Sequence, residues 1–231
     1  MPEQIQRALY LVPTPIGNVN DLSKRAYKIL SDADIIACED TRTSGNLLKK
    51  YKIKPKKLIS YHEHNEEQAA QNIIDHIFNE KSVALISDAG MPSISDPGFR
   101  VVRLAIEKQV KIIPLPGSTA LIPALAGSGM PVHAFAFAGF APQKKGRKAY
   151  LEKFLNLDIT TIYYESPYRL QKFFEEINEL AGPARKICIA REISKLNEEF
   201  IRGTVKEILE LLNQGKKIKG EIVIVVEPNK G

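Results

Sequence analysis

The sequence predicts an α/β protein made of two α/β domains. In the first half, short apolar runs alternate with amphipathic stretches of helical period, which is the pattern of a parallel sheet with helical crossovers. After about residue 116 the rhythm changes and strand-like runs follow one another more closely, so we expect domains over residues 1–116 and 117–231. A content of 44% hydrophobic and 26% charged residues excludes wholesale disorder.

The first half contains five short apolar runs that we expect to be buried strands. They cover residues 8–12, 34–39, 58–60, 82–87 and 110–115. Helices are expected between them, near 22–31, after residue 41, over 65–78 and over 99–108. The expected capping residues of the first three helices are Asn20 or Asp21, Thr41 or Thr43, and Asn65 in a capping box with Gln68.

The second half is expected to hold five more strands and three further helices. The strand-like runs cover residues 134–140, 160–165, 186–193, 198–203 and 220–227. The helical stretches lie near 147–156, 166–180 and 205–214. Ser166 as cap with Pro167 at the first helical position predicts a well-defined start for the middle helix.

Residues 112–143 carry no charged side chain, which by itself would resemble a membrane span. Five prolines and several glycines interrupt the segment, and proline breaks a helix in its interior. We therefore expect a strand, a turn, a short helix and another strand, buried where the two halves meet. The start of the sequence, MPEQIQRALY, lacks the basic-then-apolar pattern of a signal peptide, so we expect a cytoplasmic protein.

Positive charge is concentrated in three short segments, residues 49–57, 144–148 and 216–219. They hold thirteen of the 33 basic residues, so the rest of the chain is acidic, with twenty basic residues against 27 acidic ones. Each segment alone is explained equally well as a solvated loop. Three of them on an acidic body favour a surface that faces phosphates, which makes nucleic acid a candidate partner.

Three loops rich in proline, glycine and aspartate follow predicted strands, over residues 12–18, 87–98 and 114–120. In an open parallel sheet, ligands bind beyond the carboxyl ends of the strands. Taken singly, the glycines and prolines are explained as turn residues, and Asp88 and Asp96 as caps. Three such loops at one edge predict a ligand site.

Several common sites are excluded by the motifs that the sequence lacks. Neither a GxGxxG nor a GxxxxGK[ST] phosphate loop is present, and there is no GxSxG nucleophile motif. Cys38 and Cys188 lie in apolar runs and are expected to be buried free thiols. His62 and His64 are better explained by a polar turn than by a metal site, so no metal is expected.

The order and spacing of several motifs resemble one bacterial enzyme family. The motifs are LVPTPIGN, ACEDTRTS, SYHEHNE, ALISDAGMPSISDPG, PLPGSTALI, GFAPQK, YESPYRL, AREISK and KGEIVIVV. In this order they resemble the ribosomal RNA small subunit methyltransferase I family, which has the tetrapyrrole methylase fold, and the resemblance runs from Leu9 to Val226. It implies S-adenosylmethionine-dependent 2′-O-methylation of a cytidine ribose in the decoding region of 16S rRNA. It also implies a cofactor cleft between the two α/β domains and a homodimer. Because prolines interrupt the charge-free segment, no membrane partner is expected.

The resemblance further implies which residues hold the cofactor. They are Ile16, Gly17, Asp88, Ala89, Gly90, Met91, Ser118, Thr119, Tyr164, Ala190 and Gly220. Backbone N–H groups after Pro116 would suit the methionyl carboxylate, and Asp88 would suit the amino or ribose groups.

The catalytic base is left open by the sequence. Asp40, Glu165 and Lys195 are polar groups beside apolar strands, so each is a candidate, and each is equally explained as a cap or an ion-pair partner. The residues expected to contact RNA are basic, namely Lys144, Lys145, Arg147, Lys148, Lys49, Lys50 and Lys52.

Two alternatives of other classes stay open at this point. A methylase of the same fold acting on a small tetrapyrrole would share the cofactor loops without needing three basic segments. A non-catalytic RNA-binding protein of ribosome assembly would need the basic segments without the loops.

Overall fold

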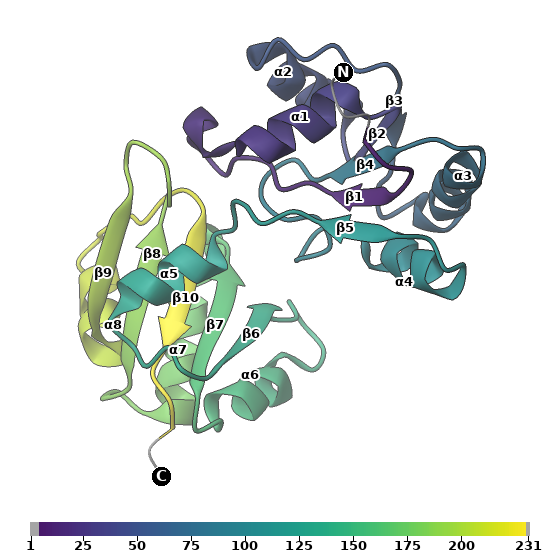
Figure 1. The fold of residues 1–231 in the computed structure, drawn as a ribbon. Helices are drawn as coiled ribbons and strands as arrows, with labels where there is room; N and C mark the ends of the chain where they lie inside the picture. Colours follow the sequence, from purple (N-terminus) through teal and green to yellow (C-terminus); the bar gives the residue numbers. More distant parts are fainter. Residues whose placement is uncertain (1–4, 230–231) are drawn as a thin grey trace. The chain divides into compact units, whose positions relative to one another are not determined.

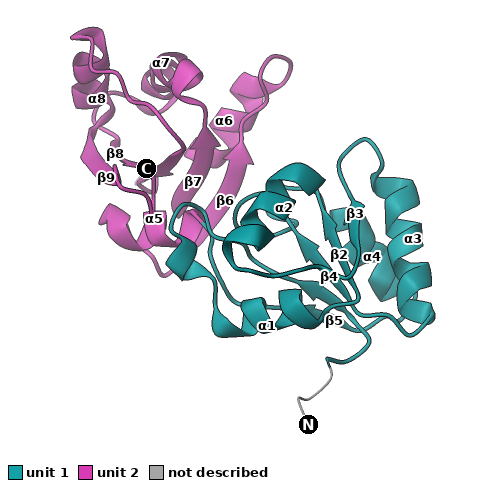
Figure 2. Cartoon of the chain, turned by 90° about the horizontal axis from the view of Figure 1, so that it is seen from above, with its two compact units in different colours: residues 1–119 teal, residues 120–231 magenta. Residues whose placement is uncertain are grey.

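The computed structural model describes residues 5–229. The chain divides into two compact units, residues 1–119 and 120–231, each with its own five-stranded sheet (Figure 2). The division between the units falls after residue 119. The change of pattern in the sequence predicted it after residue 116.

The first unit alternates strands and helices in the order predicted for a parallel sheet. Its elements are β1 (Leu9–Leu11), α1 (Lys24–Asp32), β2 (Ile35–Cys38), α2 (Thr41–Lys50), β3 (Leu58–Ser60), α3 (Glu66–Phe78), β4 (Val83–Ile86), α4 (Phe99–Glu107) and β5 (Ile112–Pro114). All pairs are parallel, in the spatial order β3-β2-β4-β1-β5. Because the strands are parallel, the loops that follow them gather at one edge of the sheet.

Helices cover both faces of this sheet (Figure 1). Leu30 of α1 and Leu48 of α2 join one buried cluster, while Ile73 of α3 and Val101 of α4 join the other. Successive residues of a strand point to opposite faces, so Tyr10 enters the first cluster whereas Leu9 and Leu11 enter the second. A sheet buried on both faces explains the continuous apolar runs in the sequence.

The second unit is mixed rather than purely parallel. Its elements are α5 (Leu121–Ser128), β6 (Phe135–Phe140), α6 (Arg147–Leu155), β7 (Thr160–Glu165), α7 (Leu170–Ala181), β8 (Lys186–Arg191), β9 (Glu199–Thr204), α8 (Val205–Asn213) and β10 (Ile222–Val226). The spatial order is β6-β7-β10-β8-β9. β6 is parallel to β7, whereas β10 runs antiparallel to β7 and β8, and β9 runs antiparallel to β8.

One face of this second sheet carries the main core of the unit. Leu151 of α6, Phe173 of α7 and Ile208 of α8 pack there against Ile189 and Ile224 of the strands. α5 packs against β8 and β10 on the opposite face (Figure 1).

The capping residues differ from those expected for three helices. Ser23 caps α1 by accepting from the backbone N–H of Ala26 at 3.0 Å, since residues 19–21 form a short 3-10 helix of their own. Asp40 caps α2, so Thr41 is already helical. Asn65 precedes α3 but makes no side-chain cap; its amide oxygen accepts from the N–H of His62 instead.

Two helix starts in the second unit are defined by hydroxyl caps. Ser166 caps a 3-10 turn, Pro167–Arg169, that leads into α7, so the predicted cap is confirmed although the first turn is not α-helical. Thr204 and Glu207 form a capping box at the start of α8, which was not predicted from the sequence.

The charge-free segment 112–143 forms β5, α5 and β6, which is the predicted strand, helix and strand. It is not buried throughout, because Ile122, Val132, Phe135 and Phe140 are exposed. In the described range 5–229, no helix has the length and apolar character to cross a bilayer.

Candidate functional site

The predicted ligand loops of the first unit come together at the carboxyl edge of its sheet. β1 lies between β4 and β5, so the loops after these three strands are neighbours. Thr14 and Gly90 exchange two backbone hydrogen bonds of 2.9 Å, which fasten the first loop to the second. The Thr14 hydroxyl also donates to the carbonyl of Ser87 at 3.1 Å.

Gly90 of the second loop lies close to Ile16 of the first loop and to Ser118 of the third. Gly90 has φ +88°, and a Cβ built on it would lie 3.4 Å from Ile16 Cγ2 and 3.8 Å from the carbonyl oxygen of Ser118. The structure therefore brings together three predicted site residues that are far apart in sequence. Gly17, Asp88 and Ala89 are exposed at this edge, so their polar groups are accessible to a ligand.

In the second unit, two further predicted residues lie in one row across the sheet. Tyr164 of β7 and Ala190 of β8 are both in register with Val223 of β10. The Tyr164 ring contacts the rings of Phe137 and Phe140 edge-on, with centroids 5.0 and 5.5 Å away. Aromatic contacts of this kind fix the orientation of the tyrosine ring.

Gly220, also predicted to hold the cofactor, has a structural reason to be glycine. Its φ is +93°, and a Cβ there would lie 2.4 Å from the carboxyl carbon of Glu192. Glu192 needs that space because its carboxylate accepts from the N–H of Glu221 at 2.9 Å. The glycine therefore positions the segment that leads into β10.

Carboxylates gather beside the ligand loops of the first unit. Glu39 follows β2 and Asp88 follows β4, and these strands are neighbours. Desolvation, reinforced by the negative charge of Asp88, raises the pKa of Glu39. Desolvation also raises the pKa of Asp88, although its carboxylate accepts from the backbone N–H of Asp40. Burial and the Glu39 charge raise the pKa of Asp96 to about 6.

Together, the carboxylates of Glu39, Asp88 and Asp96 give this edge of the sheet a negative potential that favours a cationic ligand. Asp88 and Asp96 were singled out from the sequence, whereas Glu39, at the end of the apolar run IIACE, was missed. The signal that could have identified it is positional, since a charged residue directly after a buried parallel strand lies at the ligand edge.

Replacing Asp96 with asparagine should stabilise the protein at neutral pH and not at low pH. The folded-state pKa is above the usual value, so the stability that protonation supplies is complete near pH 4 and is lost as pH rises through about 6. Asparagine does not ionise. We expect Asp96→Asn to raise the unfolding free energy by about 1–2 kcal/mol at pH 7.5, a figure reduced for the partial exposure of the side chain. Urea denaturation at pH 4.5 and 7.5 measures the difference, and an equal effect at both pH values would contradict it.

Each of the three candidate bases has partners in the structure. The Asp40 carboxylate caps α2 and pairs with Arg42, and hydrogen bonds from Arg42 lower its pKa. Glu165 is fully buried between Arg147 and Arg169. Lys195 pairs with glutamates on both sides and its pKa is raised, so it stays protonated. These contacts agree with the alternative interpretation of each as a cap or an ion-pair partner, and the identity of the base stays a prediction.

The prediction that Arg147 contacts RNA is wrong. Its side chain is only 5% exposed. It donates to Glu176 at 2.7 Å, to Glu165 at 3.3 Å and to the carbonyl of Pro142 at 3.2 Å. These contacts occupy the guanidinium on all sides, so this arginine belongs to the core of the second unit.

The other predicted RNA contacts lie on the surface of both units. Lys144 and Lys145 are exposed in the loop between β6 and α6, and Lys148 pairs with Glu179 on the surface. Lys49 and Lys50 form the last turn of α2, where positive charge is favourable to the helix dipole. Because α2 returns from the carboxyl edge to the start of β3, Lys49, Lys50 and Lys52 lie at the opposite edge from the ligand loops.

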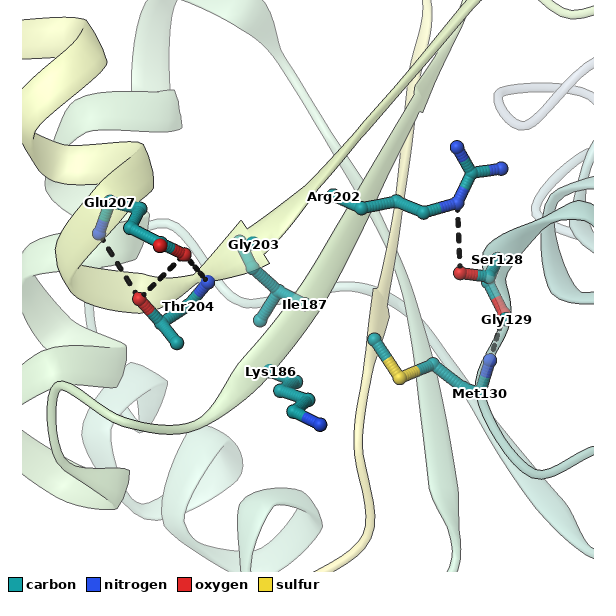
Figure 3. A pocket seen from close by; sticks show the side chains of 9 residues that line it. All are labelled: Ser128, Gly129, Met130, Lys186, Ile187, Arg202, Gly203, Thr204 and Glu207. Atoms are coloured by element: carbon teal, nitrogen blue, oxygen red, sulfur yellow. Dashed lines mark hydrogen bonds between the residues drawn. The ribbon is translucent and has the colours of Figure 1, made fainter.

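A cavity of about 410 Å³ opens in the second unit and is distinct from the predicted cofactor residues (Figure 3). Ser128, Lys186, Arg202 and Glu207 contribute polar groups to its lining. Arg202 donates to the carbonyl of Ser128 at 3.2 Å, and Glu207 is held in the capping box of α8. The polar groups of Ser128, Arg202 and Glu207 are therefore committed to holding the fold.

The two cysteines are buried side chains without an exposed thiol. Cys38 and Cys188 are buried and free, as predicted, and burial raises the pKa of both thiols to about 11. Within residues 5–229, no group of three or more histidine, cysteine, aspartate or glutamate side chains is arranged to hold a metal ion.

Comparison with known proteins gives consistent results in sequence and structure. The family model of the Tetrapyrrole (Corrin/Porphyrin) Methylases matches residues 8–209. A protein of Hydrogenobaculum sp. (strain Y04AAS1) named "Ribosomal RNA small subunit methyltransferase I" is 47% identical over 218 residues, which are 94% of each chain. A protein of the same name from Halalkalibacterium halodurans is 45% identical over 222 residues, which are 96% of this chain and 76% of the relative.

Solved structures share the fold at much lower identity. Uroporphyrin-III C-methyl transferase from Thermus thermophilus, complexed with S-adenyl homocysteine, has a TM-score of 0.65 and 19% identity, covering 95% of this chain and 97% of that one. Cobalt precorrin-4 methyltransferase, a cobalamin biosynthetic enzyme, has a TM-score of 0.67 and 17% identity, covering 98% and 97%. The two-sheet architecture described above is therefore the fold of these enzymes.

Proposed function

The chain belongs to the tetrapyrrole methylase family and, within it, to the ribosomal RNA small subunit methyltransferases I, and we propose its reaction from this membership. In this reaction, the methyl group of S-adenosylmethionine is transferred to the 2′-hydroxyl of a cytidine ribose in the decoding region of 16S rRNA. The observation that carries the proposal is the convergence of Ile16, Gly90 and Ser118 at a sheet edge lined with carboxylates. A homodimer acting in the cytoplasm is part of the same proposal.

The residues at this edge fit S-adenosylmethionine by their chemistry. The cofactor carries two positive charges, on its sulfonium and its ammonium, and the carboxylates of Glu39, Asp88 and Asp96 are complementary to them. The Nδ1 atom of His62 is buried and has no hydrogen-bond partner among the described residues. The His62 ring lies close enough to Glu39 to offset part of the rise that burial causes in the pKa of Glu39. A buried polar atom without a hydrogen-bond partner indicates a place where a polar ligand can bind.

Asp88 is the residue we assign to the cofactor's amino or ribose groups, because its carboxylate is exposed and follows a strand at the ligand edge. The loops around Ile16, Gly17 and Gly90 supply backbone groups for hydrogen bonds to the cofactor, and the glycines let the cofactor approach the backbone closely. Met91, Ser118 and Thr119 complete the first unit's share, and Tyr164, Ala190 and Gly220 are proposed as the share of the second unit.

When bound, S-adenosylmethionine supplies an electrophilic methyl group on sulfur. The task of the chain is to align that group with the ribose oxygen and to accept the hydroxyl proton. Glu39 and Asp88 make no ion pair among residues 5–229, in contrast to Glu165. Because Asp88 is already assigned to the cofactor, we assign the proton to Glu39 rather than to the candidates held in ion pairs.

A methyl-transfer assay tests the proposal directly. The purified protein is incubated with S-adenosylmethionine carrying a labelled methyl group and with 30S subunits, free 16S rRNA or a tetrapyrrole acceptor. A methylated 2′-oxygen blocks alkaline cleavage of the adjacent phosphodiester, so partial hydrolysis locates the modified ribose. Label in the tetrapyrrole alone would favour the small-molecule methylase. RNA binding without any transfer would favour the non-catalytic assembly protein.

The basic loop after β6 is expected to contribute to RNA affinity through Lys144 and Lys145. Each lysine that neutralises a phosphate adds about 0.7 to the log–log salt slope for single strands, so Lys144→Gln/Lys145→Gln should flatten the slope by about 1.4. Affinity for S-adenosylmethionine should not change. RNA titrations at several salt concentrations measure the slope. The charge-matched control is Lys153→Gln/Lys186→Gln, and an equal loss in the control would show only the effect of net charge.

A further inference from the structure

One edge of the second unit's sheet collects segments that are far apart in sequence. Glu165 at the end of β7 and Arg191 at the end of β8 are both in register with Ile222 at the start of β10. Phe140 at the end of β6 pairs with Tyr164, and Glu199 at the start of β9 pairs with Arg191. The segments 141–146, 166–169, 192–198 and 219–221 therefore all leave the sheet at this edge (Figure 1).

This edge exposes large apolar side chains to an unusual degree. Tyr168 is 96% exposed, Leu196 is 99% exposed and Phe140 is 54% exposed. An aromatic ring left in water adds nothing to the stability of the fold, and large exposed apolar groups gathered at one place mark interaction sites.

The backbone that carries Tyr168 is nevertheless held firmly. Ser166 accepts from the N–H of Tyr168, and Pro167 fixes the backbone before it. On the other side, Arg169 donates to the buried carboxylate of Glu165 at 2.7 Å. The exposed ring is therefore mounted on a rigid turn, which reduces the entropy cost of using it in binding.

Exposed lysines lie in segments that leave the sheet at the same edge. Lys144, Lys145 and Lys219 are exposed and make no ion pair or side-chain hydrogen bond among the described residues. Other basic groups here are already used, since Arg191 and Lys216 both pair with Glu199. The three lysines without a partner add positive charge to the edge that carries Tyr168, alongside the carboxylates of Glu198 and Glu221.

We propose that this edge of the second unit binds single-stranded RNA, with a base stacked on Tyr168 and phosphates held by Lys144, Lys145 and Lys219. The identity of the partner rests on the proposed function; the site and its mode of binding rest on the edge itself. Aromatic rings among basic side chains are the chemistry by which proteins hold unpaired nucleotides. A base inside a duplex offers no free face to such a ring, so the partner is an unpaired segment.

A single tryptophan provides the test, because the natural sequence contains none. In Tyr168→Trp, a base stacked on the indole should quench the fluorescence as an unstructured RNA of about 12 nucleotides is added. Phe135→Trp is the matched control, since Phe135 is 40% exposed at the other end of β6 and pairs with Thr160 at the start of β7. That variant should bind RNA equally and show no quenching.

A base-free polyanion and a truncation separate stacking from charge. Heparin should bind to Tyr168→Trp without quenching it. Tyr168→Ala should weaken RNA binding about 5- to 150-fold, the range for one stacked base, whereas Tyr168→Phe should retain wild-type affinity.

Four results would overturn the proposal. Saturable RNA binding without quenching would exclude stacking while leaving methyl transfer untouched. Equal quenching by heparin would reduce the edge to an electrostatic surface. A fluorescence change with protein concentration alone would show that a second copy of the chain covers the ring. Failure of the wild-type protein to bind any RNA would remove the proposed function together with this site.

Discussion

Replacing Arg147 with glutamine is expected to lower the free energy of unfolding by about 3–5 kcal/mol. The guanidinium lies between Glu165, whose side chain is fully buried, and Glu176, whose side chain is 23% exposed. Removing one partner of a buried ion pair leaves an uncompensated charge in a medium of low dielectric constant, which is the origin of this magnitude. Arg169 still reaches Glu165, but from the other carboxylate oxygen. Denaturant unfolding followed by circular dichroism measures the loss.

Lys148→Gln is the matched control for Arg147→Gln. Lys148 is the next residue in the same basic segment and pairs with Glu179, but both side chains are more than 60% exposed. Exposed pairs contribute about 0–1 kcal/mol, so this variant should unfold almost as the wild type does. Similar losses in the two variants would mean that Arg147 is not the internal residue described above.

The position of Arg147 also decides how RNA binding should be tested. A variant that neutralises all four basic residues of the segment 144–148 would lose stability and RNA affinity together. The two effects could not be separated. Variants restricted to Lys144 and Lys145 avoid this problem because both side chains are exposed.

Asp88→Ala is expected to weaken S-adenosylmethionine binding by about 1–3 kcal/mol, or about 5- to 150-fold. The reason is the loss of an accessible carboxylate that accepts charge-assisted hydrogen bonds. Titration calorimetry on the folded variant gives the dissociation constant. The control is Asp32→Ala, because Asp32 is an exposed carboxylate at the end of α1, near the opposite edge of the same sheet, where it pairs with Lys28.

A second variant distinguishes contact with the cofactor from support of the loop. The Asp88 carboxylate also accepts from the backbone N–H of Asp40, and Asp88→Asn keeps an acceptor for that group while losing the charge. If the charge contacts the cofactor, asparagine should lose most of the affinity that alanine loses. Full affinity in Asp88→Asn would identify Asp88 as a residue that only holds the loop.

The order of strands and helices could be predicted because each element carries its own pattern. In the first unit the sheet is buried on both faces, so its strands appear as apolar runs such as IIAC between residues 35 and 38. The caps could not be chosen, because several oxygens lie within two or three residues of each helix start. Which one reaches a free N–H depends on backbone angles, as for Ser23 and Asp40.

Some features of the candidate site could likewise be predicted from the sequence, and others could not. Loops after neighbouring parallel strands must gather at one edge, so the convergence of Ile16, Gly90 and Ser118 follows from topology. The partners of long charged side chains do not follow from topology. Arg147 meets Glu165 and Glu176 at sequence separations of 18 and 29 residues, and nothing in the segment QKKGRK distinguishes its one buried cation from the exposed ones.

The central place of β10 bears on how the protein matures during synthesis. β10 is the tenth strand in chain order, yet it lies between β7 and β8 and bonds to both. All five strands of the first unit emerge from the ribosome before any strand of the second unit, so the first unit can close early. The second sheet stays open at its middle until β10 emerges, with two unpaired strand edges facing solvent. Vectorial folding of this chain therefore ends with the insertion of a strand, and that interval is when the nascent protein is most exposed to mispairing with other chains.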